Sequence, residues 1–173
     1  IGIYGVGEIG KVVAKDLNNL GFQVFGWSRK KKKSNYFESF FGKTGFDDMI
    51  SNCDIHVSLL PLTSKTNRIF NKDIFSKMKD GVCFINGGRG EQVVESDLIL
   101  FCGNKINMAI LDVFENEPLP ENHPFWDNKN IVIWPHVSAE TNIETAAEQV
   151  AKAIKLIHSG KLPANKIDLR LEY

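Results

Sequence analysis

Three glycines near the start of the chain have the spacing of a phosphate-binding turn. Gly5, Gly7 and Gly10 follow the apolar segment Ile1–Tyr4, which is typical of a buried strand, and they precede a segment with helical spacing of apolar residues. Gly5 allows a tight turn, Gly7 leaves room for a pyrophosphate beside the backbone, and Gly10 lets the helix pack close to the strand. The unpaired N–H groups at the helix N-terminus would then bind phosphate oxygens. This segment therefore predicts a dinucleotide-binding site.

The residues that follow the second expected strand, Gln23–Trp27, indicate which dinucleotide fits. An NAD-selective site usually carries Asp or Glu at this point, where the carboxylate binds the adenosine ribose. Here the chain reads Ser28-Arg29-Lys30, followed by three more lysines that we expect to be solvated surface residues. A hydroxyl and two cations suit the 2′-phosphate of NADP. We therefore predict NADPH as the preferred cofactor, with NADH as the alternative.

Short apolar segments alternate with helical ones along most of the chain. The expected strands are residues 1–4, 23–27, 55–60, 82–86, 107–111 and 131–134. The expected helices are residues 9–20, 46–52, 72–77, 95–101 and 142–159. This alternation predicts an α/β fold, in which helices cover both faces of a parallel, doubly wound sheet of the Rossmann type. Ligands bind such a sheet at the carboxyl ends of its strands.

Composition and charge limit the classes of partner. The chain of 173 residues has 21 basic and 21 acidic residues, so a net charge of zero gives no reason to expect nucleic acid or an anionic membrane surface. The apolar runs are far shorter than the roughly 20 residues that span a bilayer. The three cysteines have no metal-ligand spacing, and an odd number of cysteines in apolar stretches is typical of reduced, packed thiols in a cytoplasmic protein. We expect no metal site.

Four further segments stand in a fixed order after the glycine loop. They are Leu60-Pro61-Leu62-Thr63, Asn86-Gly87-Gly88-Arg89-Gly90, Leu111-Asp112-Val113-Phe114-Glu115-Asn116-Glu117-Pro118-Leu119 and Trp134-Pro135-His136-Val137. In this order they resemble the D-isomer-specific 2-hydroxyacid dehydrogenase family, and within it most of all the glyoxylate/hydroxypyruvate reductases. The similarity extends from Gly2 to about Gly160. It implies the nucleotide-binding domain of a two-domain oxidoreductase that reduces small 2-keto acids, such as glyoxylate and hydroxypyruvate, to 2-hydroxy acids.

The resemblance also implies three catalytic residues, Arg89, Glu117 and His136. Reduction of a 2-keto acid needs a proton donor for the carbonyl oxygen, and imidazole suits this role because it titrates near neutral pH. Glu117 beside His136 would stabilise the imidazolium and fix the ring orientation. The planar guanidinium of Arg89 would bind the substrate carboxylate and offset charge on the carbonyl oxygen. Glu115 is the rival carboxylate, but the family pattern keeps the one next to Pro118.

Asp112, at the end of its expected strand, resembles the family residue that contacts the nicotinamide carboxamide. Asp112 joins the glycine loop and the basic segment, Ser28-Arg29-Lys30, as an expected contact of the cofactor. The expected cofactor-binding residues are Gly5, Gly7, Glu8, Ile9, Gly10, Ser28, Arg29, Lys30, Leu60, Pro61, Thr66, Gly87, Arg89, Asp112 and His136.

The resemblance implies a division of the chain into two parts. Residues 1–141 would form the dinucleotide-binding Rossmann domain, and residues 142–173 a helix and tail that return to the substrate domain. Because the chain opens at Ile1, already inside an apolar strand, we expect the N-terminal part of that substrate domain to be missing. Family members usually dimerise through the nucleotide domain, so we also expect a homodimer.

Two alternatives stay open at this stage. The first is an NAD-linked 2-hydroxyacid dehydrogenase with another substrate, such as phosphoglycerate or D-lactate, although the Ser28-Arg29 segment argues against it. The second is a non-catalytic, dinucleotide-sensing interaction module, as in corepressors that resemble this fold. A metal-dependent alcohol dehydrogenase is set aside because the sequence has no Cys/His cluster with zinc spacing.

Overall fold

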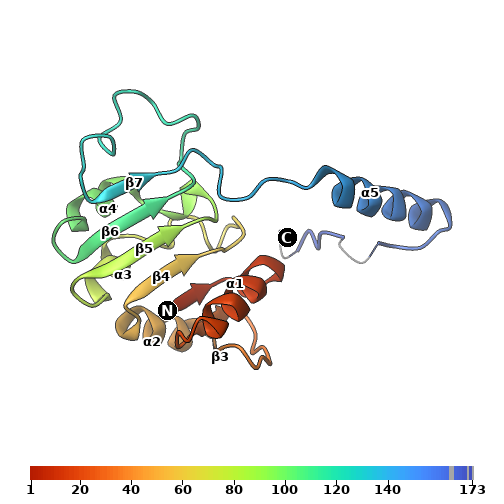
Figure 1. Cartoon of the computed structure of the whole chain (residues 1–173), viewed down its shortest axis with the longest axis horizontal. Coiled ribbons are helices and arrows are strands. Elements are labelled where there is room, and N and C mark those ends of the chain that lie inside the picture. The colour runs from red at the N-terminus through yellow and green to blue at the C-terminus, as the bar shows by residue number, and fades with distance from the viewer. Residues whose placement is uncertain (164–165, 171, 173) are drawn as a thin grey trace.

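The described residues of the computed structural model form one seven-stranded sheet, in the order β3-β2-β1-β4-β5-β6-β7 (Figure 1). The structure describes residues 1–163, 166–170 and 172, so residues 164–165, 171 and 173 of the expected tail lie outside the described residues. Every strand pairs in parallel with its neighbours. The strands are β1 (Gly2–Tyr4), β2 (Phe25–Ser28), β3 (Glu38–Phe41), β4 (Ile55–Ser58), β5 (Val82–Asn86), β6 (Ile106–Leu111) and β7 (Ile131–Ile133).

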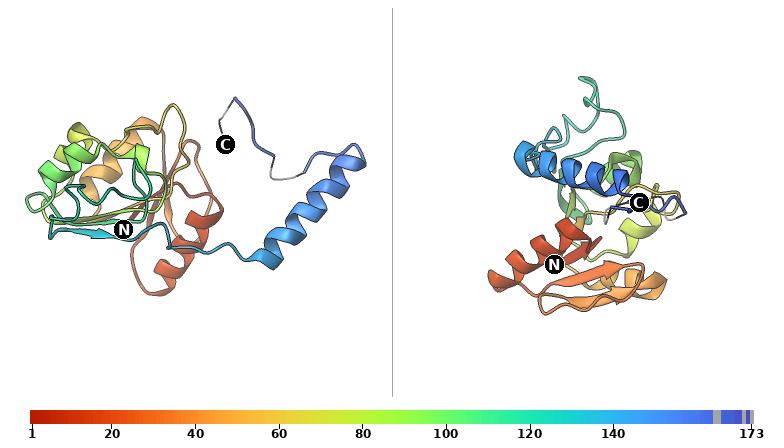
Figure 2. Two further views of the ribbon diagram at one scale, coloured as in Figure 1. Left: turned by 90° about the horizontal axis from the view of Figure 1, so that it is seen from above. Right: turned by 90° about the vertical axis from the view of Figure 1, so that its right-hand side faces the viewer.

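Helices lie on both faces of this sheet (Figure 2). The helix α1 (Glu8–Asn19) covers one face, where Ala14 packs with Ile3 and Val24. The opposite face is covered by α2 (Gly42–Asn52), α3 (Lys72–Lys77) and α4 (Glu95–Phe101). The sheet order reverses direction between β1 and β4, and in open α/β sheets ligands generally bind at the carboxyl ends of the strands that flank such a reversal. The Rossmann-type, doubly wound fold predicted from the sequence is confirmed.

Aromatic side chains fill the core between the sheet and the three helices α2 to α4. Phe70 packs edge-on against Phe84 with ring centroids 4.9 Å apart, and Tyr4 packs against Phe46 at 5.2 Å. Phe75 joins the same cluster, and all five rings are buried. Burial of one such ring stabilises the fold by roughly 1.5–3 kcal/mol. This rigid layer fixes the strands whose carboxyl ends carry the site.

The sequence did not predict β3, and it placed the start of α2 too late. β3 has the sequence Glu38-Ser39-Phe40-Phe41, which is short and lacks a clear period of two, and it lies at the edge of the sheet. Its pairing with β2 and the edge-on contact of Phe40 with Phe25 stabilise it, and neither is visible in the local pattern. Because β3 ends at Phe41, α2 begins at Gly42 rather than at the predicted Phe46.

The last helix, α5 (Ile143–His158), stands apart from the sheet (Figure 1). None of its residues is buried, and its apolar residues Ile143, Val150 and Ile157 are each more than half exposed. The side chain of Asn142 caps its first turn by accepting a hydrogen bond from Thr145 N. Within the described part of the chain, none of the helices has both the length and the apolar character needed to cross a membrane.

A buried pair of Tyr4, in β1, and His56, in β4, predicts sensitivity of the fold to acid. Tyr4 Oη lies 2.9 Å from His56 Nδ1, and both side chains are fully buried. Burial, reinforced by the positive charges of the N-terminus and Lys79, lowers the pKa of His56 to about 4. The unfolded chain, in which a histidine titrates near pH 6.5, therefore binds a proton more readily. The stability that depends on neutral His56 is fully present above about pH 6.5 and is lost as the pH falls toward 4.

We expect this histidine to reduce the free energy of unfolding by about 2 kcal/mol when the pH falls from about 7.5 to about 5. Urea titrations at both pH values measure the difference. His56→Leu should lose this part of the pH dependence, whereas replacement of the exposed His158 by Gln should keep it. An unchanged pH dependence in the His56 variant would contradict the assignment.

Candidate active site and cofactor-binding loop

The glycine loop between β1 and α1 has the geometry that dinucleotide binding requires. Gly5 has a φ of +102°, and a Cβ there would lie 2.6 Å from the carbonyl oxygen of Leu59. A Cβ at Gly10 would overlap the carbonyl oxygen of Gly5. Gly7, by contrast, borders open space and begins α1 without a side-chain cap. The first N–H groups of α1 are therefore open to an anion, and the residues present fit a pyrophosphate.

The basic segment after β2 lies at the same edge of the sheet. Ser28 is the last residue of β2, and its hydroxyl donates a hydrogen bond to the carbonyl oxygen of Lys30 at 2.7 Å. This bond folds the chain back on itself, and the side chains of Arg29 and Lys30 are both exposed. The two residues from the glycine loop, Glu8 and Ile9, are exposed as well, and Glu8 forms an ion pair with Lys11 at 2.9 Å.

The residues predicted to contact the cofactor after β4 and β5 also take part in hydrogen bonds that shape the backbone there. Thr66 Oγ1 donates to the carbonyl oxygen of Pro61 at 2.6 Å and accepts from the N–H of Thr63 at 2.8 Å, which closes the turn after β4. Leu60 is buried beneath this turn. Gly87, at the end of β5, donates its N–H to the carbonyl oxygen of Ser58 at 3.0 Å. The bonds of Thr66 shape the turn after β4, and the bond of Gly87 links the carboxyl ends of β4 and β5.

Arg89 is held at the carboxyl end of β5 by two buried amide side chains. Asn86 Nδ2 donates to the carbonyl oxygen of Arg89 at 3.0 Å, and Asn86 Oδ1 accepts from Gly88 N. Gln92 Oε1 accepts from Arg89 N at 3.3 Å and from Ser58 Oγ, while its Nε2 donates to Leu60 O. Gln92 is fully buried and was missed in the sequence, because a glutamine three residues after an arginine carries no recognisable signal.

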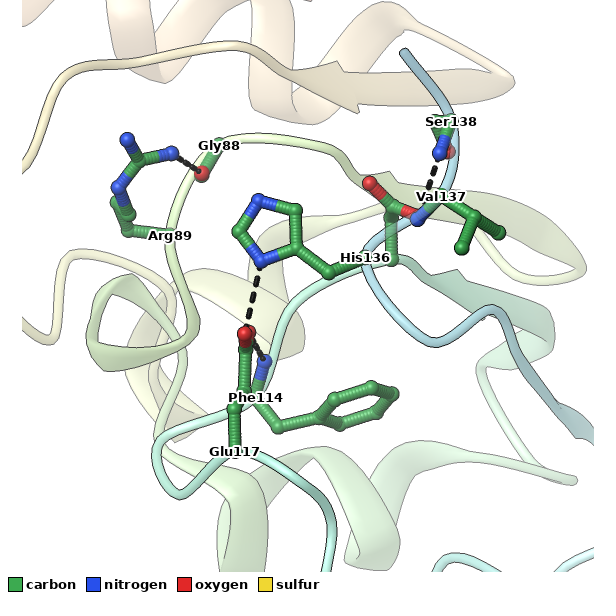
Figure 3. Close-up of polar contacts among 8 residues, drawn as sticks. Gly88, Arg89, Phe114, Glu117, His136, Val137 and Ser138 are labelled. Atoms are coloured by element: carbon green, nitrogen blue, oxygen red, sulfur yellow. Dashed lines mark hydrogen bonds and ion pairs between the residues drawn. The ribbon is translucent and has the colours of Figure 1, made fainter. Parts of the chain in front are cut away.

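Glu117 and His136 form a close pair, as the sequence predicts. Their Oε2 and Nδ1 atoms lie 2.7 Å apart, and the other ring nitrogen of His136, Nε2, points away from Glu117 (Figure 3). The second carboxylate oxygen of Glu117 accepts a hydrogen bond from Phe114 N at 3.0 Å. The side chain of His136 is about half exposed and so is accessible to a substrate. Glu117 therefore orients the imidazole and leaves Nε2 available for proton transfer.

Asp112 accepts the hydrogen bonds that fix the backbone around His136. Its Oδ1 accepts hydrogen bonds from Val137 N at 2.8 Å and Ser138 N at 3.0 Å, and its carbonyl oxygen accepts from His136 N. His136 has a φ of +55°, a left-handed conformation that a non-glycine residue adopts only when its surroundings impose it. The predicted role of Asp112 was cofactor binding, and the structure adds this fixing of the His136 turn.

The charge state of Glu117 follows from its neighbours. Partial burial raises the pKa of this carboxyl, but the hydrogen bonds from the His136 ring and from Phe114 N, together with the charges of His136 and Arg89, outweigh it. The pKa of Glu117 therefore lies below its usual range. Its carboxylate remains ionised at neutral pH and can stabilise a cationic imidazole.

The fold and these contacts define a Rossmann-type dinucleotide-binding domain with a paired carboxylate and imidazole at the carboxyl edge of its sheet. Residues 1–138 match the family described as D-isomer specific 2-hydroxyacid dehydrogenase, NAD binding domain. The chain belongs to this family.

Curated relatives that match most of this chain are named glyoxylate/hydroxypyruvate reductase A. The protein from Photorhabdus laumondii is 39% identical over 174 residues, which cover 100% of this chain and 56% of the relative. The protein from Serratia proteamaculans is 37% identical, with the same coverage. The chain thus spans about half the length of the curated relatives it matches.

Solved structures show the same fold. A D-isomer specific 2-hydroxyacid dehydrogenase from Xanthobacter autotrophicus, in complex with NADPH and MES, has a TM-score of 0.96 and 35% identity, and the match covers 100% of this chain and 72% of that one. An NADPH-dependent glyoxylate/hydroxypyruvate reductase from Sinorhizobium meliloti, in complex with NADP and sulfate, has a TM-score of 0.92 and 36% identity, with 99% and 56% covered.

Proposed function

We propose that this protein reduces small 2-keto acids, glyoxylate and hydroxypyruvate first among them, to 2-hydroxy acids with NADPH. The observation that carries this proposal is the 2.7 Å pair of Glu117 and His136 at the sheet edge that also carries Arg89 and the glycine loop. The names of the relatives and the NADP bound to solved structures of the family support the choice of substrate and cofactor.

The residues at the carboxyl edge fit NADPH. The open face of Gly7 and the uncapped N-terminus of α1 would hold the pyrophosphate. Arg29 would hold the 2′-phosphate, together with Ser28 once its hydroxyl hydrogen turns from Lys30 O to the phosphate. Asp112 Oδ1 accepts both hydrogen bonds from the His136 turn, and among the described residues this leaves its other oxygen for the contact with the nicotinamide carboxamide that we propose. Bound NADPH would supply the hydride that reduces the carbonyl carbon of the substrate.

The side chains of this domain would supply the rest of the chemistry. The guanidinium of Arg89 binds the carboxylate of the keto acid and sets its carbonyl group toward His136. Reduction would leave negative charge on the carbonyl oxygen, and His136 Nε2 would donate a proton to it. Glu117 stabilises the cationic ring before this transfer. In the oxidative direction His136 accepts the same proton from the hydroxyl group.

Helix α5 and the tail would belong with the substrate-binding part of the protein, while residues 1–141 form the nucleotide domain. The exposed apolar residues of α5 and its distance from the sheet support this division (Figure 2). We also propose that the protein functions as a homodimer, as family members usually do.

Initial rates with a panel of keto acids test the proposed substrate class. With NADPH in excess, glyoxylate and hydroxypyruvate should be reduced faster than pyruvate and 3-phosphohydroxypyruvate. Arg89→Lys should raise the KM for glyoxylate strongly, because lysine cannot form the bidentate contact with a carboxylate. A preference for pyruvate or for the phosphorylated acid would move the protein to another specificity within the family.

The basic segment should control the choice between the two cofactors. Arg29→Ala is expected to weaken NADPH binding by roughly 10–100-fold, because a hydrogen bond to a charged group contributes about 1.5–3 kcal/mol. NADH affinity should stay within about twofold, since NADH has no 2′-phosphate for Arg29 to bind. Dissociation constants from cofactor fluorescence measure both effects. Lys31→Ala, in the same exposed segment, is the matched control, and equal losses for both cofactors would rule out a 2′-phosphate contact.

A further inference from the structure

The loop that carries Glu117 is attached to α4 through a single carboxylate. Glu95, the first residue of α4, accepts a hydrogen bond from Glu115 N at its Oε1 atom, at 3.1 Å. Its other oxygen, Oε2, lies 3.2 Å from His123 Nε2. The side chains of Glu95 and His123 are 15% and 19% exposed, so water screens this pair far less than a surface ion pair. One side chain thus binds two points of the loop.

The hydrogen bonds of His123 assign the direction of this contact. His123 Nδ1 lies 3.3 Å from Phe125 N, and a backbone N–H can only donate, so Nδ1 is the acceptor. The ring hydrogen of a neutral His123 is then on Nε2 and points to Glu95 Oε2. The ring also packs edge-on against Phe125, which is itself buried, at a centroid distance of 4.5 Å. The contacts at its two ring nitrogens and the packing against Phe125 therefore fix the orientation of the His123 ring.

Glu117 lies only two residues beyond the point that Glu95 holds. Its Oε1 accepts from Phe114 N, so the turn from residue 114 to residue 117 closes on itself. From the other side, the backbone of Gly90 fits so closely against this turn that a Cβ there would overlap the carbonyl group of Phe114. The position of the Glu117 carboxylate therefore depends on the backbone between Phe114 and Glu115.

We propose that Glu95 is a positioning residue of the active site, whose carboxylate joins Glu115 N to His123 and so holds the turn from which Glu117 meets His136. This inference rests on the proposed function. Glu95 does not touch the reacting atoms, and the exposed ion pair between Arg68 and Glu115, with its atoms 4.0 Å apart, is too long and too solvated to replace it.

The arrangement requires a carboxylate at position 95. A glutamine has one acceptor oxygen and one amide group that only donates. If its oxygen keeps the bond to Glu115 N, its NH₂ group faces the N–H of His123, and if the amide is turned over, the bond to Glu115 N is lost. Glu95→Gln therefore conserves size and burial but breaks one of the two contacts.

The test compares Glu95→Gln with the unchanged protein by two readouts. The first is the titration of the Glu117 carboxyl followed by NMR, which needs no turnover. Its pKa lies below the usual range because of the contacts from His136, Phe114 N and Arg89, and it should rise toward the ordinary value when the turn loosens. The second readout is the pH profile of kcat, whose acidic limb should move to higher pH, with kcat about 5–30-fold lower and the KM for NADPH within about twofold.

Asp97→Asn is the matched control, because Asp97 also lies on α4 and accepts a backbone hydrogen bond, from Lys72 N, away from the loop. It should leave both readouts unchanged. In a protein that already carries Glu117→Gln, adding Glu95→Gln should lower kcat no further. His123→Gln offers a second variant that can keep the donor to Glu95, and it should give a smaller change than His123→Leu. An unmoved Glu117 titration in folded Glu95→Gln would overturn the positioning role, whether or not glyoxylate is the substrate.

Discussion

Replacement of His136 by asparagine is expected to lower the turnover of glyoxylate by roughly 10³-fold, because it removes the group that we propose as proton donor to the carbonyl oxygen. Asparagine suits the test because it tolerates the left-handed backbone that His136 adopts, with its φ of +55°. The Asp112 contacts to Val137 N and Ser138 N should therefore persist. The affinity for NADPH should change by less than about threefold, since the phosphate-binding residues lie elsewhere.

Steady-state rates and NADPH titrations of the variant measure these two effects separately. His158→Asn, at the exposed end of α5, is the control histidine and should leave both quantities unchanged. Turnover at the original rate in His136→Asn would remove this residue from the mechanism. A loss of NADPH affinity as large as the loss of turnover would instead assign it to cofactor binding.

Gly90→Ala is expected to cause the second large loss, about 100-fold in kcat. The added Cβ would overlap the carbonyl group of Phe114 and come too close to Glu115 N, and neither backbone atom can move aside as a flexible side chain would. The turn that carries Glu117 must therefore shift, and a displacement of about 1 Å at an active site can cost roughly 100-fold in rate. Arg89 is the preceding residue, so the loop that we propose binds the substrate would shift as well.

Gly81→Ala separates this effect from a general loss of stability. Gly81 has a φ of +80° in a turn before β5, and a Cβ there would meet open space, so the substitution strains the backbone far from the site. It should lower the thermal midpoint without changing kcat. If Gly90→Ala keeps its full kcat, the close packing of the two loops has no role in catalysis.

The parts of the fold that the sequence predicted are those with strong local patterns. The buried strands β1, β4 and β5 are apolar runs bounded by turn residues, and α3 begins where Asn71 provides its cap. The glycine loop was recognisable because three glycines fall within six residues between an apolar segment and a helical one. Close backbone contacts explain Gly5 and Gly10, whereas Gly7 borders open space. The edge strand β3 was not recognisable, because its residues lack an alternating pattern and its pairing with β2 stabilises it instead.

Only those site residues that stand in the ordered motifs were predicted from the sequence. Arg89, Glu117 and His136 each stand in a motif, and the structure brings Glu117 to His136. The residues around them, such as Gln92 and Glu95, form hydrogen bonds between segments that lie far apart in the sequence. Such contacts depend on how the strands are placed side by side, and no periodicity or spacing reports them.

The most direct measurement is the initial rate of glyoxylate reduction by the intact protein, with NADPH and NADH compared side by side at equal concentrations. We predict rapid oxidation of NADPH and much slower oxidation of NADH, because Ser28 and Arg29 stand where an NAD-selective site carries a carboxylate. Equal rates with both cofactors would contradict the role of the basic segment. Oxidation of neither cofactor would contradict the proposed reductase function itself.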